Sequence, residues 1–178
     1  MPTPMPTILR RLPFFVDGTS VRIPDGPAVA IKHHQIVIWV GLGPVGDPVP
    51  PDEINRFPAL LDTGFNGNFL LREDHLLEWA KTTIPESNYN LIGTTIIHGE
   101  LVPMFEADLW IFGNVPGFRD QVAEVPIFRM EFNGGIALCP SHMTRLRLPL
   151  LGLVALRKNR LRLMLNAERK HLSMRGPD

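Results

Sequence analysis

The sequence contains a single cysteine, Cys139, among 178 residues, which excludes an internal disulfide and any cysteine-based zinc cluster. A lone thiol is compatible with a reducing compartment and is typical of a small buried hydrophobe. No apolar run approaches the length needed to span a bilayer, so we expect no membrane partner. The N-terminal stretch also lacks the apolar segment of a secretory leader, because Pro13 and Asp17 interrupt it. We therefore expect a cytoplasmic protein.

Charge of one sign is not in excess, because 18 lysines and arginines balance 18 aspartates and glutamates. Zero net charge argues against electrostatic attraction of the whole molecule to nucleic acid or to an anionic membrane. The C-terminal end is an exception, since from Arg145 onward nine basic residues stand against two acidic ones. An RNA-binding protein that uses this basic end is therefore one alternative, although the alternation around Arg162 is also typical of a solvated strand face.

Several common catalytic and cofactor patterns are missing. Ser87 and Ser141 lack the flanking glycines of a nucleophile elbow. Cys139 and His142 have a ligand-like spacing, but no second pair at zinc spacing accompanies them, so we expect no metal. The glycine-rich segment 41–46 matches the spacing of a dinucleotide site, yet prolines in the next five residues prevent the helix that such a site requires. We expect a loop there and no cofactor.

Proline and glycine, by contrast, are abundant, with 18 and 15 copies. This composition predicts many turns, few long helices and a β-rich class. Residues 1–30 are expected to form an extended N-terminal arm, and residues 31–175 one folded domain. Periodicity predicts strands at 35–40, 59–61, 69–71, 94–97, 101–112, 125–132, 136–138, 148–151 and 161–165, and short helices at 73–81 and 154–158.

Two local details follow from the same periodicity. The first helix should bury Leu76, Leu77 and Ala80 on its inner face. The strands on either side of His98-Gly99 should form a hairpin with these two residues at its tip.

The strongest chemical signal is the triplet Asp62-Thr63-Gly64, which directly follows the short apolar strand 59–61. Gly64 permits a close backbone approach, and its amide can donate to a neighbouring carboxylate. Thr63 can hydrogen-bond the backbone of an opposing loop. If a two-fold axis brings two copies of Asp62 together, the two carboxylates share one proton, because like charges at short range cannot both ionise. One carboxylate would then act as a base and the other as an acid.

With this loop, the apolar strands around it, the hairpin and a later Leu150-Leu151-Gly152 element, residues 33–173 resemble the retropepsin-like, single-lobed aspartic proteases. The likeness is to bacterial members with an Asp-Thr-Gly-Phe-Asn-Gly loop. The bulky Phe65 and the few glycines at the hairpin tip differ from many retroviral members.

The resemblance implies an all-β, closed-barrel-like acid protease fold with one or two short helices, assembled as a homodimer. It implies that Asp62, Thr63 and Gly64 form the catalytic loop of an aspartic endopeptidase, a hydrolase that acts on peptide or protein substrates. Leu151 and Gly152 would support that loop from behind. Ile97, His98 and Gly99 would cover the substrate. A catalytically inactive dimerisation module with the same fold remains the second alternative.

Overall fold

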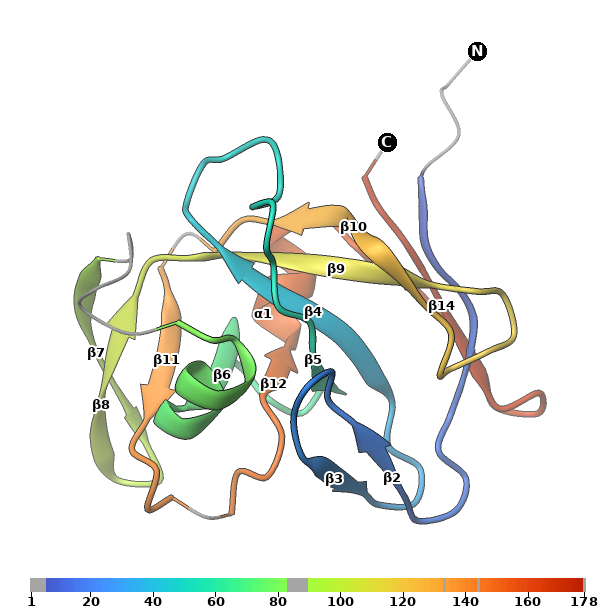
Figure 1. Cartoon of the computed structure of the whole chain (residues 1–178), viewed down its shortest axis with the longest axis horizontal. Helices are drawn as coiled ribbons and strands as arrows, with labels where there is room; N and C mark the ends of the chain where they lie inside the picture. The colour runs from blue at the N-terminus through green and yellow to red at the C-terminus, as the bar shows by residue number, and fades with distance from the viewer. Residues whose placement is uncertain (1–5, 83–89, 133, 144, 178) are drawn as a thin grey trace.

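The computed structural model describes residues 6–82, 90–132, 134–143 and 145–177, and these form a predominantly β structure (Figure 1). The predicted all-β class is confirmed. The helices in the described residues are two short ones, η1 (His75–Trp79), a π-helical turn, and α1 (Leu153–Lys158). Neither has the length and apolar character required to cross a membrane.

The largest sheet in the described residues contains nine strands. From one edge to the other they are β10 (Val122–Met130), β9 (Asp108–Asn114), β4 (Val37–Gly43), β5 (Phe57–Asp62), β12 (Leu150–Gly152), β6 (Phe69–Arg72), β11 (Ile136–Cys139), β8 (Glu100–Phe105) and β7 (Leu91–Ile97). β4 and β9 are buried over almost their whole length, which explains their nearly continuous apolar sequences.

The expectation of a closed barrel is wrong. Among the described strands β10 pairs only with β9 and β7 only with β8, so the sheet has two separate edges. The main core is enclosed in another way, because Leu9, Leu12 and Met174 of a second sheet belong to the same apolar cluster as the large sheet. Side-chain packing between two sheets therefore replaces hydrogen bonding between the two edges.

The second sheet joins the two ends of the described chain. Its strands, in spatial order, are β1 (Thr7–Pro13), β14 (His171–Arg175) and β13 (Arg162–Asn166). Asn114 at the end of β9 accepts a hydrogen bond from the Arg10 amide at 2.9 Å and donates one to the Arg10 carbonyl at 2.9 Å. This pair of bonds fastens β1 to the large sheet. Part of the segment expected as an N-terminal arm thus contributes to the core.

A separate hairpin precedes the large sheet. It consists of β2 (Thr19–Arg22) and β3 (Ala28–Ile31), which pair antiparallel. Val21, Val29 and Ile31 point into the main core, as the alternating burial of the two strands indicates.

The centre of the large sheet has two apolar faces. Leu61, Leu71 and Leu151 belong to the main core, whereas Leu70 is part of a smaller cluster and Leu150 packs against it. Consecutive residues of a strand point to opposite faces, so this division follows from the sequence once the register is known. The smaller cluster lies on the same face as the candidate site.

The helix after β6 departs from the sequence-based expectation. His75, Leu76 and Trp79 are buried, but Leu77 is 50% exposed and Ala80 only partly buried. The reason is the wider π-helical turn, which rotates the inner face away from the positions that a 3.6-residue period selects.

The glycine-rich segment 41–46 forms the end of β4 and the start of a loop. A Cβ atom at Gly41 would lie 2.6 Å from the Ile54 side chain, and one at Gly43 would lie 2.7 Å from the Trp110 indole nitrogen. These glycines therefore allow close packing. Residues 44–46 lie in the expected loop between two strands, whereas 41–43 belong to β4 itself.

Candidate functional site

Asp62 lies at the end of β5 and is half-buried. Its Oδ1 accepts a hydrogen bond from the Gly64 amide at 2.9 Å, and its carbonyl accepts one from the Phe65 amide at 3.1 Å. Thr63 and Gly64 are exposed. The apolar strand thus delivers one carboxylate to a tight turn, where a backbone donor holds it and solvent or a second molecule can reach it.

The Leu150-Leu151-Gly152 element forms β12, which lies between β5 and β6. It runs parallel to β5 with Gly152 opposite Asp62, and antiparallel to β6. The Gly152 amide donates to the Asn68 carbonyl at 2.9 Å, and the Leu153 amide donates to the Phe65 carbonyl at 3.0 Å. β12 and the start of α1 therefore hold both ends of the turn that follows Asp62.

Gly152 and Phe65 explain why the loop closes so tightly. A Cβ atom at Gly152 would clash with the Gly67 carbonyl oxygen and would lie 2.6 Å from the Phe65 carbonyl oxygen. The Phe65 ring covers both glycines, since a Cβ atom at Gly67 would lie 2.9 Å from Phe65 Cε1. The bulky residue after the triplet therefore occupies the space that two glycines leave open.

The expected hairpin is present, with β7 and β8 joined at His98-Gly99. Both turn residues have positive φ, 50° at His98 and 85° at Gly99, the pattern of a type I′ turn. Strand 101–112 of the sequence-based expectation is divided into β8 and β9. Ile97 and His98 line a cavity, whereas Gly99 is not among its lining residues.

The cavity has a volume of about 440 Å³ and lies between the β7–β8 turn and the centre of the large sheet. Leu60 and Leu150 line it. These two residues are paired across β5 and β12, and two positions further along the same strands Asp62 is paired with Gly152. Asp62 therefore projects from the same face of β5 as Leu60, just beyond the cavity lining. The cavity was not predicted from the sequence. The strand alternation Leu60-Leu61-Asp62 did indicate that Leu60 and Asp62 share one face.

Lys32, Arg145 and Arg147 also line the cavity. The sequence assigned both arginines to a basic C-terminal end, but the fold brings them together with β5, β12 and the hairpin. The alternation in Arg145-Leu146-Arg147-Leu148 indicates one exposed and one inward face, as Leu148 is buried. Two residues of the candidate RNA-binding segment are thus part of this cavity.

A histidine with a strongly shifted pKa lies next to β6. His75 is fully buried, stacks on Trp79 with 4.1 Å between ring centroids, and accepts a hydrogen bond from the Arg72 amide at 3.3 Å. Burial lowers its pKa to about 4, against the opposing effect of the neighbouring Asp74. At Asp74, burial acts to raise the pKa. The Arg72 guanidinium, which donates a hydrogen bond to this carboxylate at 2.8 Å, acts in the opposite direction, and the pKa of Asp74 is lowered overall.

The buried His75 makes stability depend on pH. A histidine in the unfolded chain titrates near 6.5, so between that pH and about 4 the unfolded state binds more protons. The free energy of unfolding should therefore fall by about 3 kcal/mol as pH decreases across this interval. Urea unfolding at several pH values measures this slope.

Two substitutions test the origin of that slope. His75→Phe keeps an aromatic ring against Trp79 but cannot titrate, so it should flatten the pH dependence. His33→Gln, at an exposed position, is the matched control and should leave the slope as in the parent. An unchanged slope in His75→Phe would assign the pH dependence to other groups.

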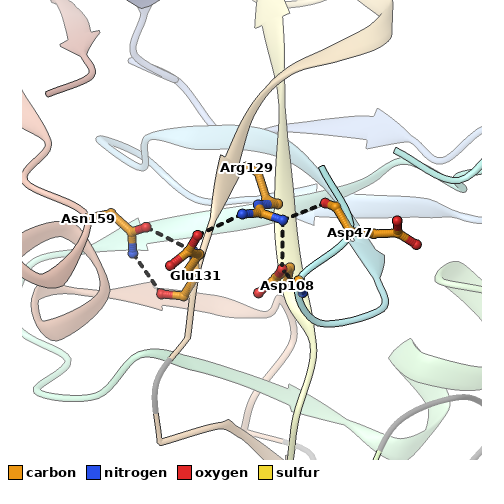
Figure 2. Close-up of polar contacts among 6 residues, drawn as sticks. Asp47, Asp108, Arg129, Glu131 and Asn159 are labelled. Carbon is orange, nitrogen blue, oxygen red and sulfur yellow. Dashed lines mark hydrogen bonds and ion pairs between the residues drawn. The ribbon is translucent and has the colours of Figure 1, made fainter. Parts of the chain in front are cut away.

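A second cluster of charges lies at the start of β9 (Figure 2). Arg129 lies 3.7 Å from the buried Asp108, donates to Glu131 at 2.7 Å and donates to the Asp47 carbonyl at 2.6 Å. Burial raises the pKa of Asp108 above its usual value. The Gly46 amide, which donates a hydrogen bond to this carboxylate at 2.9 Å, and the charge of Arg129 offset part of that rise. Both carboxylates are engaged by the guanidinium, so this cluster fastens the loop after β4 to β9 and β10.

The amide of Asn159 extends this cluster to the end of α1. It accepts from the Glu131 amide at 2.8 Å and donates to the Glu131 carbonyl at 3.0 Å (Figure 2). None of the residues labelled in Figure 2 lines the cavity. We assign the cluster a structural role.

Cys139 and His142 both line the cavity. Cys139 is fully buried, as the sequence indicated, and burial raises the pKa of its thiol to about 11. His142 Nε2 lies 3.2 Å from Glu100. Over the described part of the chain, no group of three or more histidine, cysteine or acidic residues could hold a metal ion.

Asp62 and its turn, the β12 glycine and the adjoining cavity are brought together from distant parts of the sequence. Comparison with protein-family models, with curated proteins and with solved structures finds no match to the chain.

Proposed function

We propose that this protein is an aspartic endopeptidase of the retropepsin-like type, active as a homodimer in which each subunit supplies one Asp62. The observation that carries the proposal is the position of Asp62 in a turn held by β12, with Gly152 directly opposite it. The features that support this assignment are the turn, the β12 glycine and the hairpin, whereas the described strands form an open sheet and not a closed barrel.

The chemistry of peptide hydrolysis requires a second carboxylate beside Asp62. A symmetric copy of the same turn supplies it, since two like charges at short range then share a single proton. The ionised carboxylate removes a proton from a water held between the two, and the protonated one donates to the scissile carbonyl as the tetrahedral intermediate forms. The pair therefore provides both acid and base.

The exposure of the turn supports assembly through this region. Thr63 and Gly64 are exposed, and Leu153, the residue after the β12 glycine, is 48% exposed although it is a large aliphatic side chain. A two-fold interface is self-complementary, so contacts made by these residues would occur twice. Burying Leu153 in such an interface would remove apolar surface from water and stabilise the dimer.

The hairpin supports a substrate cleft next to Asp62. Ile97 and His98 line the cavity from one side, and Leu60, on the same strand as Asp62, lines it from the other. An extended peptide lying between the hairpin tip and the centre of the sheet would pass the carboxylate at the end of β5. We assign the hairpin tip the role of covering the substrate.

Peptide hydrolysis tests this function directly. A diverse peptide library is incubated with the purified protein from mildly acidic to neutral pH, and cleavage products are identified by mass spectrometry. Cleavage that disappears in Asp62→Asn supports the proposal, and cleavage that is equal in both proteins contradicts it. A folded dimer that cleaves no peptide would favour the catalytically inactive dimerisation module instead.

Dimer dependence provides an independent expectation. Far below the dissociation constant of the dimer, the active fraction is proportional to protein concentration, so specific activity should fall about tenfold for each tenfold dilution. Initial rates over a dilution series, compared with sedimentation velocity at the same concentrations, measure this. Constant specific activity in a sample shown to be monomeric would exclude a shared dyad.

A further inference from the structure

The cavity beside Asp62 has a chemical character of its own. Its inner wall is apolar, with Leu60, Leu70 and Leu150 contributed by three adjacent strands of the sheet. Its volume of about 440 Å³ lies within the range of small-ligand pockets. It can hold one large apolar side chain together with the groups that flank it.

The outer part of the cavity is positively charged. Lys32, Arg145 and Arg147 are exposed lining residues, and within the described ranges none of them forms an ion pair. The acidic lining residue is Glu100, which is already engaged with His142 at 3.2 Å. Three cations from two separate segments therefore face one carboxylate, which already has a hydrogen-bond partner in His142.

We propose that this cavity selects peptides in which a large apolar residue is adjacent to an acidic residue. The apolar side chain enters between the hairpin tip and the centre of the sheet, and the neighbouring carboxylate accepts charge-assisted hydrogen bonds from the arginines at the rim. This selection rests on the proposed peptidase function, because it describes the substrate of that same site. All the cavity residues that this selection uses belong to one subunit.

The expected preference is moderate, because the three cations are exposed and salt screens them. A peptide with glutamate next to leucine or phenylalanine should be cleaved with about tenfold higher kcat/KM than the same peptide with glutamine. The preference should decrease as salt concentration rises, whereas a preference for the apolar residue should not.

Matched peptides and charge reversal test the selection. The pair of peptides differs only in glutamate or glutamine at the acidic position, and a third peptide carries lysine there. Arg145→Glu combined with Arg147→Glu should remove the preference for glutamate and favour the lysine peptide. Lys32→Glu, on a different segment, should weaken the preference in the same direction. Arg169→Glu, an exposed reversal outside the cavity lining, is the control.

A binding measurement separates this inference from the proposed function. Fluorescence anisotropy of the labelled peptides with Asp62→Asn reports selection without hydrolysis. Cleavage by the parent with no difference between the glutamate and glutamine peptides overturns the selection and leaves the peptidase function standing. Binding that favours glutamate, without cleavage by the parent, supports the selection and overturns the peptidase function. Neither binding nor cleavage of any peptide overturns both.

Discussion

Asp62→Asn is expected to reduce kcat for peptide cleavage by about 10³-fold, the effect of removing a positioned acid or base. Asparagine has nearly the same shape as aspartate, and its side-chain oxygen can still accept the hydrogen bond from the Gly64 amide, which is 2.9 Å long in the parent. The turn should therefore persist. What is lost is the ability of the two carboxylates to share one proton and to exchange roles.

The control for this substitution is Asp120→Asn, which changes an aspartate that is exposed and lies 3.9 Å from Arg119. Circular dichroism and sedimentation should be the same for the parent and both variants. Cleavage at the parental rate by a folded Asp62→Asn dimer would reject Asp62 as the catalytic carboxylate.

Mixing the parent with Asp62→Asn tests the sharing of the dyad. When equal amounts of the two proteins exchange subunits at random, about one quarter of the dimers carry two aspartates. Activity should therefore fall to about one quarter of that of the parent alone at the same total protein concentration. Activity equal to about one half would indicate that each subunit is active by itself.

Gly152→Ala is expected to destabilise the fold by about 3 kcal/mol and to remove activity with it. The added Cβ atom would meet backbone atoms, the carbonyl oxygens of Gly67 and Phe65, the second at 2.6 Å. Backbone atoms cannot rotate away, so β12 must shift from the turn that holds Asp62. Urea unfolding measures the first effect and peptide cleavage the second.

Two further substitutions separate the causes of this loss. Gly18→Ala is the control, because a Cβ atom there would lie 3.6 Å from its nearest neighbour, the Ile31 carbonyl oxygen. Phe65→Ala combined with Gly152→Ala removes the ring that lies 2.6 Å from the new atom but keeps both carbonyl groups. Because Phe65→Ala loses packing of its own, the reference is Phe65→Ala alone, and against it Gly152→Ala should still destabilise, by less than in the parent. No destabilisation against that reference would assign the whole effect to the ring.

The local elements around the site follow from short-range patterns. Apolar residues before Asp62, turn residues at His98-Gly99 and the glycine after Leu151 each act over a few positions. The strands β5 and β12, the hairpin and α1 are accordingly found within a few residues of their predicted bounds. Phe65 could not be interpreted from the sequence, because its role depends on a glycine that is far away along the chain.

The pairing partners of several strands could not be predicted. β1 and β14 lie at opposite ends of the sequence, and their contact depends on long-range burial of Leu9, Leu12 and Met174 rather than on a local signal. The closed barrel was predicted by analogy, and the structure closes the core with this second sheet instead. The π-helical turn at His75 also escaped a pattern based on a 3.6-residue period.

Local patterns of residues are enough to predict that the domain is rich in β-strands, that one aspartate follows an apolar strand, and that a glycine element and a hairpin lie downstream. These properties depend on neighbouring residues, for which alternation and turn preference are direct physical signals. The three-dimensional fold was needed to show that Gly152 lies opposite Asp62 and that Arg145 and Arg147 share a cavity with Leu60. Such contacts arise because strands far apart in sequence bury their apolar faces together, and no local pattern specifies which strands will meet.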